Sequence, residues 1–149
     1  MPPPFPSALL AIDAALQAGS PGPDRLTEVC RILQRLPHYT GVYLYALAGD
    51  ELVLRAFEGR VTEHVRIPVG QGICGASVRT HAPVVVEDVA SDPRYLACNL
   101  QTRSEIVFPI LRGATYLAQI DVDSDDPASF GPADEAFLAQ VAERLERFF

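Results

Sequence analysis

Two cysteines stand at positions where the sequence could support nucleophilic or redox chemistry. Cys74 follows Gly72 at the expected start of a helix, where main-chain N–H groups and the helix dipole stabilise a thiolate. Cys98 lies in the irregular polar stretch RYLACNLQ, where a thiol is accessible to solvent. Because the thiolate is the nucleophilic form of cysteine, the two residues predict a reactive-thiol site.

Acidic residues recur on the strands expected near the end of the chain, as Glu105, Asp121 and Asp123. In the stretch QIDVDS, Asp121 and Asp123 are two positions apart and share one face of a strand, while Ile120 and Val122 face the core. Carboxylates that crowd on one half-buried face raise the pKa of at least one member, which then keeps a proton near neutral pH. The pattern predicts a proton donor beside the thiols.

An ordinary structural explanation exists for each of these features. A single loop cysteine is commonly inert, and aspartates at strand ends commonly serve turns. The run DVDSDD loosely resembles a calcium loop, but it lacks the glycine and the terminal glutamate of an EF-hand. No CxxC pair and no Cys/His cluster with zinc spacing occurs, so the sequence predicts no metal and no cofactor.

A glycine motif, Gly70, Gly72 and Gly75, reads G-x-G-x-x-G, and the acids Glu87 and Asp88 follow 17 and 18 positions after Gly70. This spacing resembles a dinucleotide-binding fingerprint. The preceding stretch HVRIPV carries His, Arg and Pro, whereas a buried parallel strand is almost purely apolar. We therefore expect the glycines to form a tight turn that brings main chain close to a small ligand.

The elements that must position these residues follow from periodicity and turn signals. Cys30 lies on the apolar stripe of the second expected helix and is interpreted as a core residue. The strands are joined by short turns, which predicts an antiparallel sheet with terminal helices on one face and ligand-site loops on the other, an α+β fold. We expect helices over residues 7–18, 24–36, from 73, and from 132; strands over 41–47, 51–57, 64–69, 83–87, 105–111 and 115–123; and a long polar loop over 88–103.

Composition limits the class of protein. A chain of 149 residues with 48% hydrophobic residues suits a single domain, here divided into a Pro-rich arm and first helix (1–23) and the main unit (24–149). The net charge of −7 disfavours nucleic acid, and no apolar run approaches a membrane span. Three cysteines and no secretory signal predict a cytoplasmic protein.

From Gly41 to the C-terminus, the chain resembles the free methionine-R-sulfoxide reductases, which are stand-alone GAF domains. The matching stretches are TGVYLY, VRIPVGQGICG, VEDV, YLAC, SEIVFPI and IDVDS, in the family's order. The combination of VRIPVG-x-G-[IV]-CG with AC and then SEIV is specific to this family, and ordinary signalling GAF domains do not carry it.

The resemblance implies roles for individual residues. The cysteine of the AC pair attacks the sulfoxide, which corresponds to Cys98. The glutamate of SEIV and the two late aspartates contact the substrate, which corresponds to Glu105, Asp121 and Asp123. An aromatic pair packs on the methionine side chain, which corresponds to Tyr39 and Tyr43.

The chain departs from the family at three positions. His64 stands where well-known members have a third cysteine, which often resolves the catalytic one. Tyr39 stands where the family has Trp, and Asn99 where it has Asp. These changes leave the nucleophile in place and make Cys74 the candidate that resolves Cys98.

The function expected from these features is reduction of free L-methionine-R-sulfoxide, a defence against oxidative stress. Cys98 becomes a sulfenic acid, Asp123 or, as second choice, Glu105 donates the proton, and Cys74 forms a disulfide that thioredoxin or a similar dithiol reduces. The remaining carboxylates, Asp88 included, hold the substrate ammonium. A homodimer is compatible with the sequence. The alternative is a non-catalytic GAF module that binds a small ligand or senses oxidants.

Overall fold

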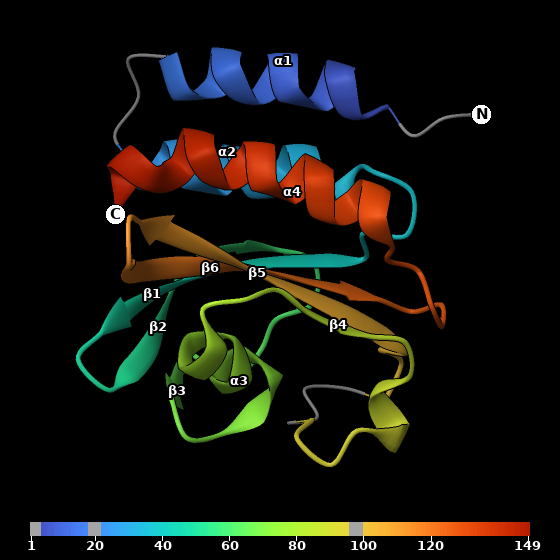
Figure 1. The fold of residues 1–149 in the computed structure, drawn as a ribbon. Helices are drawn as coiled ribbons and strands as arrows, with labels where there is room; N and C mark the ends of the chain where they lie inside the picture. Colours follow the sequence, from blue (N-terminus) through green and yellow to red (C-terminus); the bar gives the residue numbers. More distant parts are fainter. Residues whose placement is uncertain (1–3, 18–21, 96–99) are drawn as a thin grey trace.

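The structure, a computed structural model, describes residues 4–17, 22–95 and 100–149. Within these ranges no helix is long and apolar enough to cross a membrane. The elements, shown in Figure 1, are α1 (Phe5–Gln17), α2 (Gly22–Gln34), β1 (Gly41–Ala48), β2 (Glu51–Glu58), β3 (Arg66–Pro68), α3 (Gly72–Thr80), β4 (Val84–Val86), β5 (Ser104–Arg112), β6 (Thr115–Ser124) and α4 (Pro132–Leu145), with short 3-10 turns at Val89–Ser91 and Glu146–Phe148.

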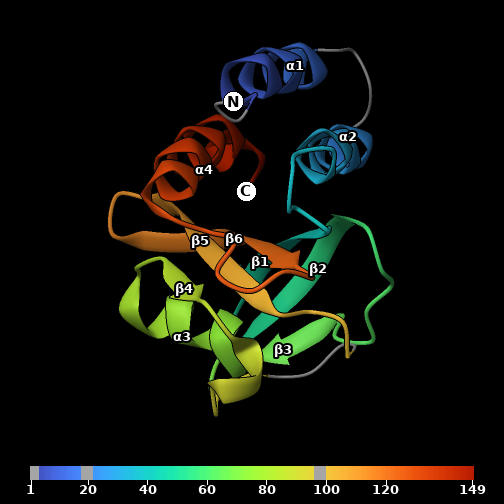
Figure 2. The same ribbon diagram turned by 90° about the vertical axis from the view of Figure 1, so that its right-hand side faces the viewer.

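The strands form one six-stranded sheet in the order β3-β2-β1-β6-β5-β4 (Figure 2). Every pairing among the described strands is antiparallel, as the short turns predicted. Gly49 and Gly113 adopt the positive φ angles that the two tight hairpins require. The antiparallel order also rules out the dinucleotide interpretation of the glycine motif, because that fold requires parallel strands joined by crossover helices.

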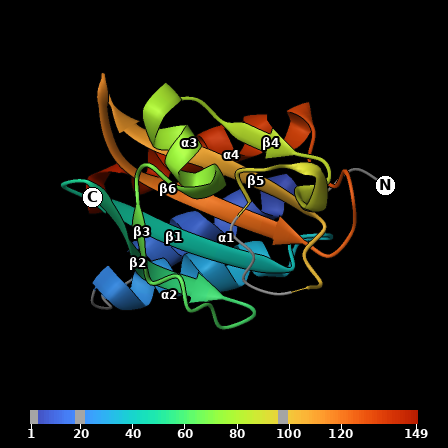
Figure 3. The same ribbon diagram turned by 90° about the horizontal axis from the view of Figure 1, so that it is seen from below.

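The helices α2 and α4 pack on one face of the sheet, α1 packs on these two helices as an outer layer, and α3 lies across the other face (Figures 1 and 3). The predicted α+β arrangement, with terminal helices on one side and ligand-site segments on the other, is confirmed. Along β6, Ile120 and Val122 are fully buried beneath the helices. Asp121 and Asp123 therefore face α3, since successive side chains of a strand point to opposite faces.

The core on the helix side is built from hydrocarbon and aromatic packing. The rings of Phe5 and Phe137 stack at 4.1 Å between centroids, which joins α1 to α4. The Arg144 guanidinium donates to Asp13 at 2.7 Å and adds a polar link between the same helices. Cys30 is fully buried in this core, as predicted, and burial raises the pKa of its thiol. It has no access to solvent and does not take part in the site.

Two strands near the site are shorter than expected. The segment predicted as strand 64–69 is a regular strand only over Arg66–Pro68, and the His64 carbonyl accepts from a tyrosine hydroxyl described below. The segment 83–87 pairs only over Val84–Val86, and Pro83 has no N–H to add to the ladder. Part of the predicted loop 88–103 forms the turn Val89–Ser91, which Asp88 caps.

Candidate active site

A pocket opens on the face of the sheet opposite the three long helices. It contains about 370 Å³ of space, its open mouth included. Strands β1, β5 and β6 form its floor, α3 forms one wall, and the segments around His64 and Tyr95 complete the rim. The lining residues are Tyr45, His64, Ile67, Gly72, Ile73, Cys74, Tyr95, Glu105, Asp121 and Asp123.

Three carboxylates form the acidic part of the floor. Asp121 and Asp123 come from β6, and Glu105 on β5 lies directly opposite Asp123 in the strand register. All three side chains are buried, with Asp121 at 6% and Asp123 at 8% exposure. The prediction that the two aspartates share the site face of their strand is confirmed, and the sheet adds Glu105 as their cross-strand neighbour.

The start of α3 places Cys74 against these acids. Gly72 has a φ of 73°, which permits the sharp entry into the helix, and a Cβ at Gly75 would lie only 2.5 Å from the Val69 carbonyl oxygen. The Cys74 thiol donates to Asp121 Oδ2 at 3.4 Å, and the Cys74 carbonyl accepts from Gln119 Nε2 at 3.1 Å. Strand β6 thus fixes both the side chain and the main chain of Cys74.

Burial among like charges sets the protonation of the site. The pKa of Asp123 is raised well above its usual value, first by burial and then by the charge of Asp121. Burial also raises the pKa of Asp121, and a hydrogen bond from Glu105 opposes the rise at both aspartates. The predicted rise in the pKa of a carboxyl group on this face is thus confirmed at Asp123.

The prediction that the helix start stabilises a Cys74 thiolate is wrong. The pKa of Cys74 is raised well above its usual value by burial, and next by the charges of Asp121 and Glu105. Loss of water and the nearby carboxylates outweigh the main-chain N–H groups of α3 at this position. Cys74 is therefore a neutral thiol at physiological pH, and its hydrogen points to a carboxylate.

Two tyrosines of β1 hold the segment that carries His64. Tyr45 donates its hydroxyl to the His64 carbonyl at 2.7 Å, and Tyr43 donates to the Arg60 carbonyl at 2.6 Å. Arg60 in turn pairs with Asp125 at 2.7 Å, beyond the end of β6. The position where the resembled family has a cysteine therefore lies at the rim of the pocket, because His64 lines it.

Of the two predicted aromatic contacts, the structure brings neither into the pocket lining. Tyr43 lies on the site face, stacked on Phe57 at 5.9 Å, and its neighbour Tyr45 is the lining residue. Tyr39 is buried in the helix-side core, where its hydroxyl donates to Asp134 Oδ1 at 2.8 Å and its ring packs on Phe130. Tyr39 therefore lies outside the pocket lining, and its contact with the substrate stays a prediction.

Asp88, predicted to bind the substrate ammonium, is also outside the pocket lining. Its carboxylate accepts from the Ala90 N–H at 3.2 Å and from the Ser91 hydroxyl at 3.0 Å, and so caps a local turn. Cys98, the predicted nucleophile, lies outside the described residues. Tyr95, three positions earlier, lines the pocket.

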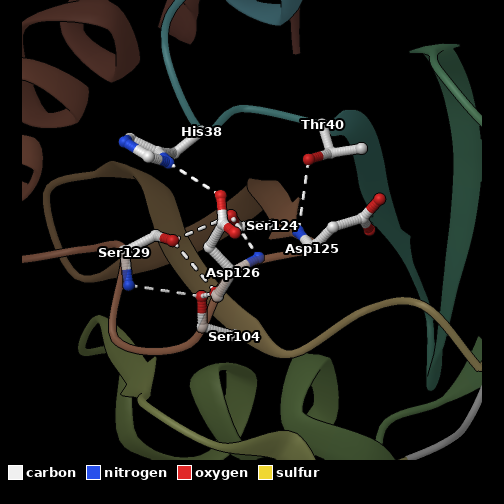
Figure 4. Close-up of polar contacts among 7 residues, drawn as sticks. All are labelled: His38, Thr40, Ser104, Ser124, Asp125, Asp126 and Ser129. Carbon is white, nitrogen blue, oxygen red and sulfur yellow. Dashed lines mark hydrogen bonds and ion pairs between the residues drawn. The ribbon is translucent and has the colours of Figure 1, made fainter.

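The acidic run after β6 forms a hydrogen-bonded turn, as Figure 4 shows. Asp126 pairs with His38 at 3.0 Å, and the Asp125 N–H donates to the Thr40 hydroxyl at 3.2 Å. The Asp125 carboxylate pairs with Arg60. Both aspartates therefore already have protein partners, which agrees with the prediction that this run is not a calcium loop. This turn closes the end of β6 next to Asp123. The residues drawn are His38, Thr40, Ser104, Ser124, Asp125, Asp126 and Ser129.

Comparisons with known proteins give the family context. A model of the GAF domain matches residues 23–147. The free methionine-R-sulfoxide reductase of Escherichia coli is 34% identical over 116 residues, which is 78% of this chain and 70% of that protein. A type II free methionine-R-sulfoxide reductase structure from Thermoplasma acidophilum has 37% identity and a TM-score of 0.82, and the match covers 85% and 91% of the two chains. The Neisseria meningitidis free methionine-R-sulfoxide reductase, solved in complex with its substrate, has 31% identity and a TM-score of 0.89, with 97% and 87% covered.

Proposed function

The chain is a GAF domain that belongs to the free methionine-R-sulfoxide reductases, and we propose that it reduces free L-methionine-R-sulfoxide to methionine. One observation supports this function above the others. Asp121 Oδ1 and Asp123 Oδ1 are buried at the pocket, and neither has a hydrogen-bond partner within the described residues. Buried carboxylate oxygens are costly without donors, so the pocket favours a ligand that supplies them.

The α-ammonium group of a free amino acid meets this requirement. It offers three N–H donors and a positive charge, which suits the buried carboxylate of Asp121. A methionine sulfoxide inside a peptide chain has no such group. The apolar lining residues Ile67 and Ile73, with the rings of Tyr45 and Tyr95, provide surface for the side chain. The pocket therefore favours the free amino acid over the peptide-bound residue.

The first chemical step is assigned to Cys98, by its match to the AC pair of the family. The Cys98 thiolate attacks the sulfoxide sulfur, and Asp123 gives a proton to the sulfoxide oxygen. The oxygen passes to Cys98, which becomes a sulfenic acid, and methionine leaves reduced by two electrons. The raised pKa of Asp123 supports this role, because the residue must hold a proton at neutral pH in order to give it up.

The second step is assigned to Cys74. The Cys74 sulfur attacks the Cys98 sulfenic acid, a disulfide forms, and the hydroxyl leaves as water. Asp121 Oδ2, which already accepts the Cys74 thiol hydrogen, takes this proton and passes it to the departing hydroxyl, so that one thiol and one sulfenic acid give one disulfide and one water. A dithiol such as thioredoxin then reduces the disulfide and restores both thiols. In Cys74→Ser we expect one rapid turnover per protein but no thioredoxin-driven cycling. Mass spectrometry of the parent after one turnover should find a Cys74–Cys98 disulfide, and a persistent sulfenic acid would remove Cys74 from this step.

Racemic methionine sulfoxide with dithiothreitol tests the function itself. The protein should release methionine and stop near half conversion, with the S epimer left, because one pocket accepts one configuration at sulfur. Addition of a methionine-S-sulfoxide reductase should then complete the conversion. Release of no methionine, with measurable binding of the sulfoxide, would instead favour a GAF module that binds a ligand or senses oxidants.

A further inference from the structure

Three side chains of the pocket wall bring metal-ligating atoms together. One atom each from Cys74, Glu105 and Asp121 lies within 4.8 Å of the other two, and all three residues are buried. The residues come from α3, β5 and β6, so their proximity is a product of the fold and not of a short sequence motif. A thiol with two carboxylates offers a donor set of one sulfur and two oxygens.

We propose that this pocket binds a thiophilic divalent cation of the Zn²⁺ type, with the Cys74 thiolate and one oxygen each of Asp121 and Glu105 as ligands. Zn–S bonds of about 2.3 Å and Zn–O bonds of about 2.0 Å at a tetrahedral angle place sulfur and oxygen about 3.5 Å apart. The Cys74 Sγ and Asp121 Oδ2 atoms lie 3.4 Å apart. The distance between these two ligand atoms is therefore already close to the value that a tetrahedral zinc site requires.

The unpartnered oxygens at the pocket point independently to a cationic ligand. Asp121 Oδ1 and Asp123 Oδ1 are buried and make no hydrogen bond within the described part of the chain. Buried carboxylates present negative charge in this pocket, and a divalent cation neutralises it. Binding displaces the thiol proton of Cys74 to solvent, since sulfur coordinates as the thiolate. The sulfur ligand selects Zn²⁺ or Co²⁺ over Mg²⁺ and Ca²⁺, which prefer oxygen.

The cation and the substrate should exclude each other, a consequence that rests on the proposed function. The metal occupies the carboxylates that are proposed to hold the substrate ammonium, and it also ties up the Cys74 sulfur needed for the disulfide. Thiophilic cations should therefore inhibit reduction reversibly, in competition with methionine-R-sulfoxide, and a chelator should restore activity.

Direct binding of Co²⁺ to the reduced full-length protein tests the site without any substrate. We expect one equivalent to give a thiolate-to-cobalt charge-transfer band, and Zn²⁺ to abolish it by displacement. Cys74→Ser should lose the band, and Glu105→Gln should weaken binding at least tenfold. Glu87→Gln is the matched control, because Glu87 is exposed and outside the pocket lining; it should bind as the parent does. Cys98→Ser should keep the band.

The outcomes separate this inference from the proposed function. No charge-transfer band in the parent, a band that survives in Cys74→Ser, or a band that is lost in Cys98→Ser would each overturn the site. Equal weakening in Glu87→Gln and Glu105→Gln would show general surface binding and overturn it as well. If Co²⁺ binds through Cys74 but methionine-R-sulfoxide neither displaces it nor is reduced, the metal site stands and the proposed function fails.

Discussion

The two faces of the sheet are both buried, yet strand β6 presents different chemistry to each of them. Under α1, α2 and α4, β6 presents Ile120 and Val122, which are fully buried among apolar side chains. Toward α3, the same strand presents Asp121 and Asp123 beside Cys74. A strand alternates its side chains with a period of two, so one strand can serve a hydrocarbon core and a polar pocket independently. Stability should therefore depend mainly on one face and activity on the other.

The two described cysteines repeat this contrast. Burial is the largest cause of a raised pKa at both Cys30 and Cys74. Cys30 lies among apolar residues and has no role in the site, whereas Cys74 donates to Asp121 in a pocket that is open to a ligand. Burial alone thus does not determine whether a cysteine can take part in chemistry. The groups that surround the thiol determine it.

The largest effect is expected at the nucleophile. Cys98→Ser should reduce methionine release to background, because a serine hydroxyl is not ionised at neutral pH and is a poor nucleophile toward sulfur. Circular dichroism and the melting temperature should stay as in the parent. As the matched cysteine control, Cys30→Ala should lower the melting temperature and leave kcat unchanged. Retention of more than a few per cent of parent turnover in Cys98→Ser would refute the assignment.

Adjacent residues of β6 should give opposite phenotypes. Ile120→Ala should lower the free energy of unfolding by about 3 kcal/mol, the usual cost of a large-to-small change in a packed core. Asp121→Asn should keep or raise the free energy of unfolding, because it removes a charge whose burial is unfavourable. Urea denaturation of both variants measures the difference. If Asp121→Asn proved as destabilised as Ile120→Ala, the division of labour between the faces would be wrong.

Within the pocket, the two aspartates should separate in their kinetics. Asp123→Asn should lower kcat about 10²-fold, the scale of a lost general acid, because a proton donor acts in the transition state. Asp121→Asn should mainly raise KM in assays with dithiothreitol, because an ammonium partner acts in the bound substrate as well. Initial rates over a range of substrate concentrations resolve the two parameters. If both variants showed the same fall in kcat and the same rise in KM, the assignment of Asp123 as the proton donor would be contradicted.

The smallest effect is a pH dependence of stability. The pKa of Asp123 is raised in the folded protein well above its ordinary value, so the folded protein keeps a proton that the unfolded chain releases above about pH 4. The free energy of unfolding should therefore fall as the pH rises above about 4, the ordinary range of an aspartate. Asp123→Asn should flatten this slope, while Glu87→Gln, an exposed acid, should not. A stability that rises with pH in this range would contradict the buried proton.

The sequence predicted the sheet and its site face because both depend on local alternation. Asp121 and Asp123 share a face by spacing alone, and the hairpins follow from short turns at Gly49 and Gly113. The sequence also placed these acids beside the thiols, but the individual contacts of Cys74 could not be predicted, because Glu105 and Asp121 reach it from two strands that are remote in sequence. The same remoteness hid the loss of water that raises the pKa of its thiol.

Two residues outside the pocket lining have local explanations. Tyr39 and Tyr43 are four positions apart and would share a face in a continuous strand, but β1 begins only at Gly41 and His38 has a φ of 69°. The turn breaks the alternation, so that Tyr39 packs in the helix-side core. Tyr45, two positions after Tyr43, lines the pocket, since the strand period places both on the site face. Asp88 accepts from the Ala90 N–H and the Ser91 hydroxyl, and so caps a local turn.

The most direct test compares free L-methionine-R-sulfoxide with its Nα-acetyl derivative in the parent protein. The two molecules share the reacting sulfoxide, and they differ in the ammonium group that the buried carboxylates are proposed to bind. We predict that acetylation lowers kcat/KM at least a hundredfold, because it removes the positive charge and leaves the buried Asp121 carboxylate without its donors. Equal kcat/KM for the two substrates would contradict the claim that the acidic face of the sheet selects the free amino acid.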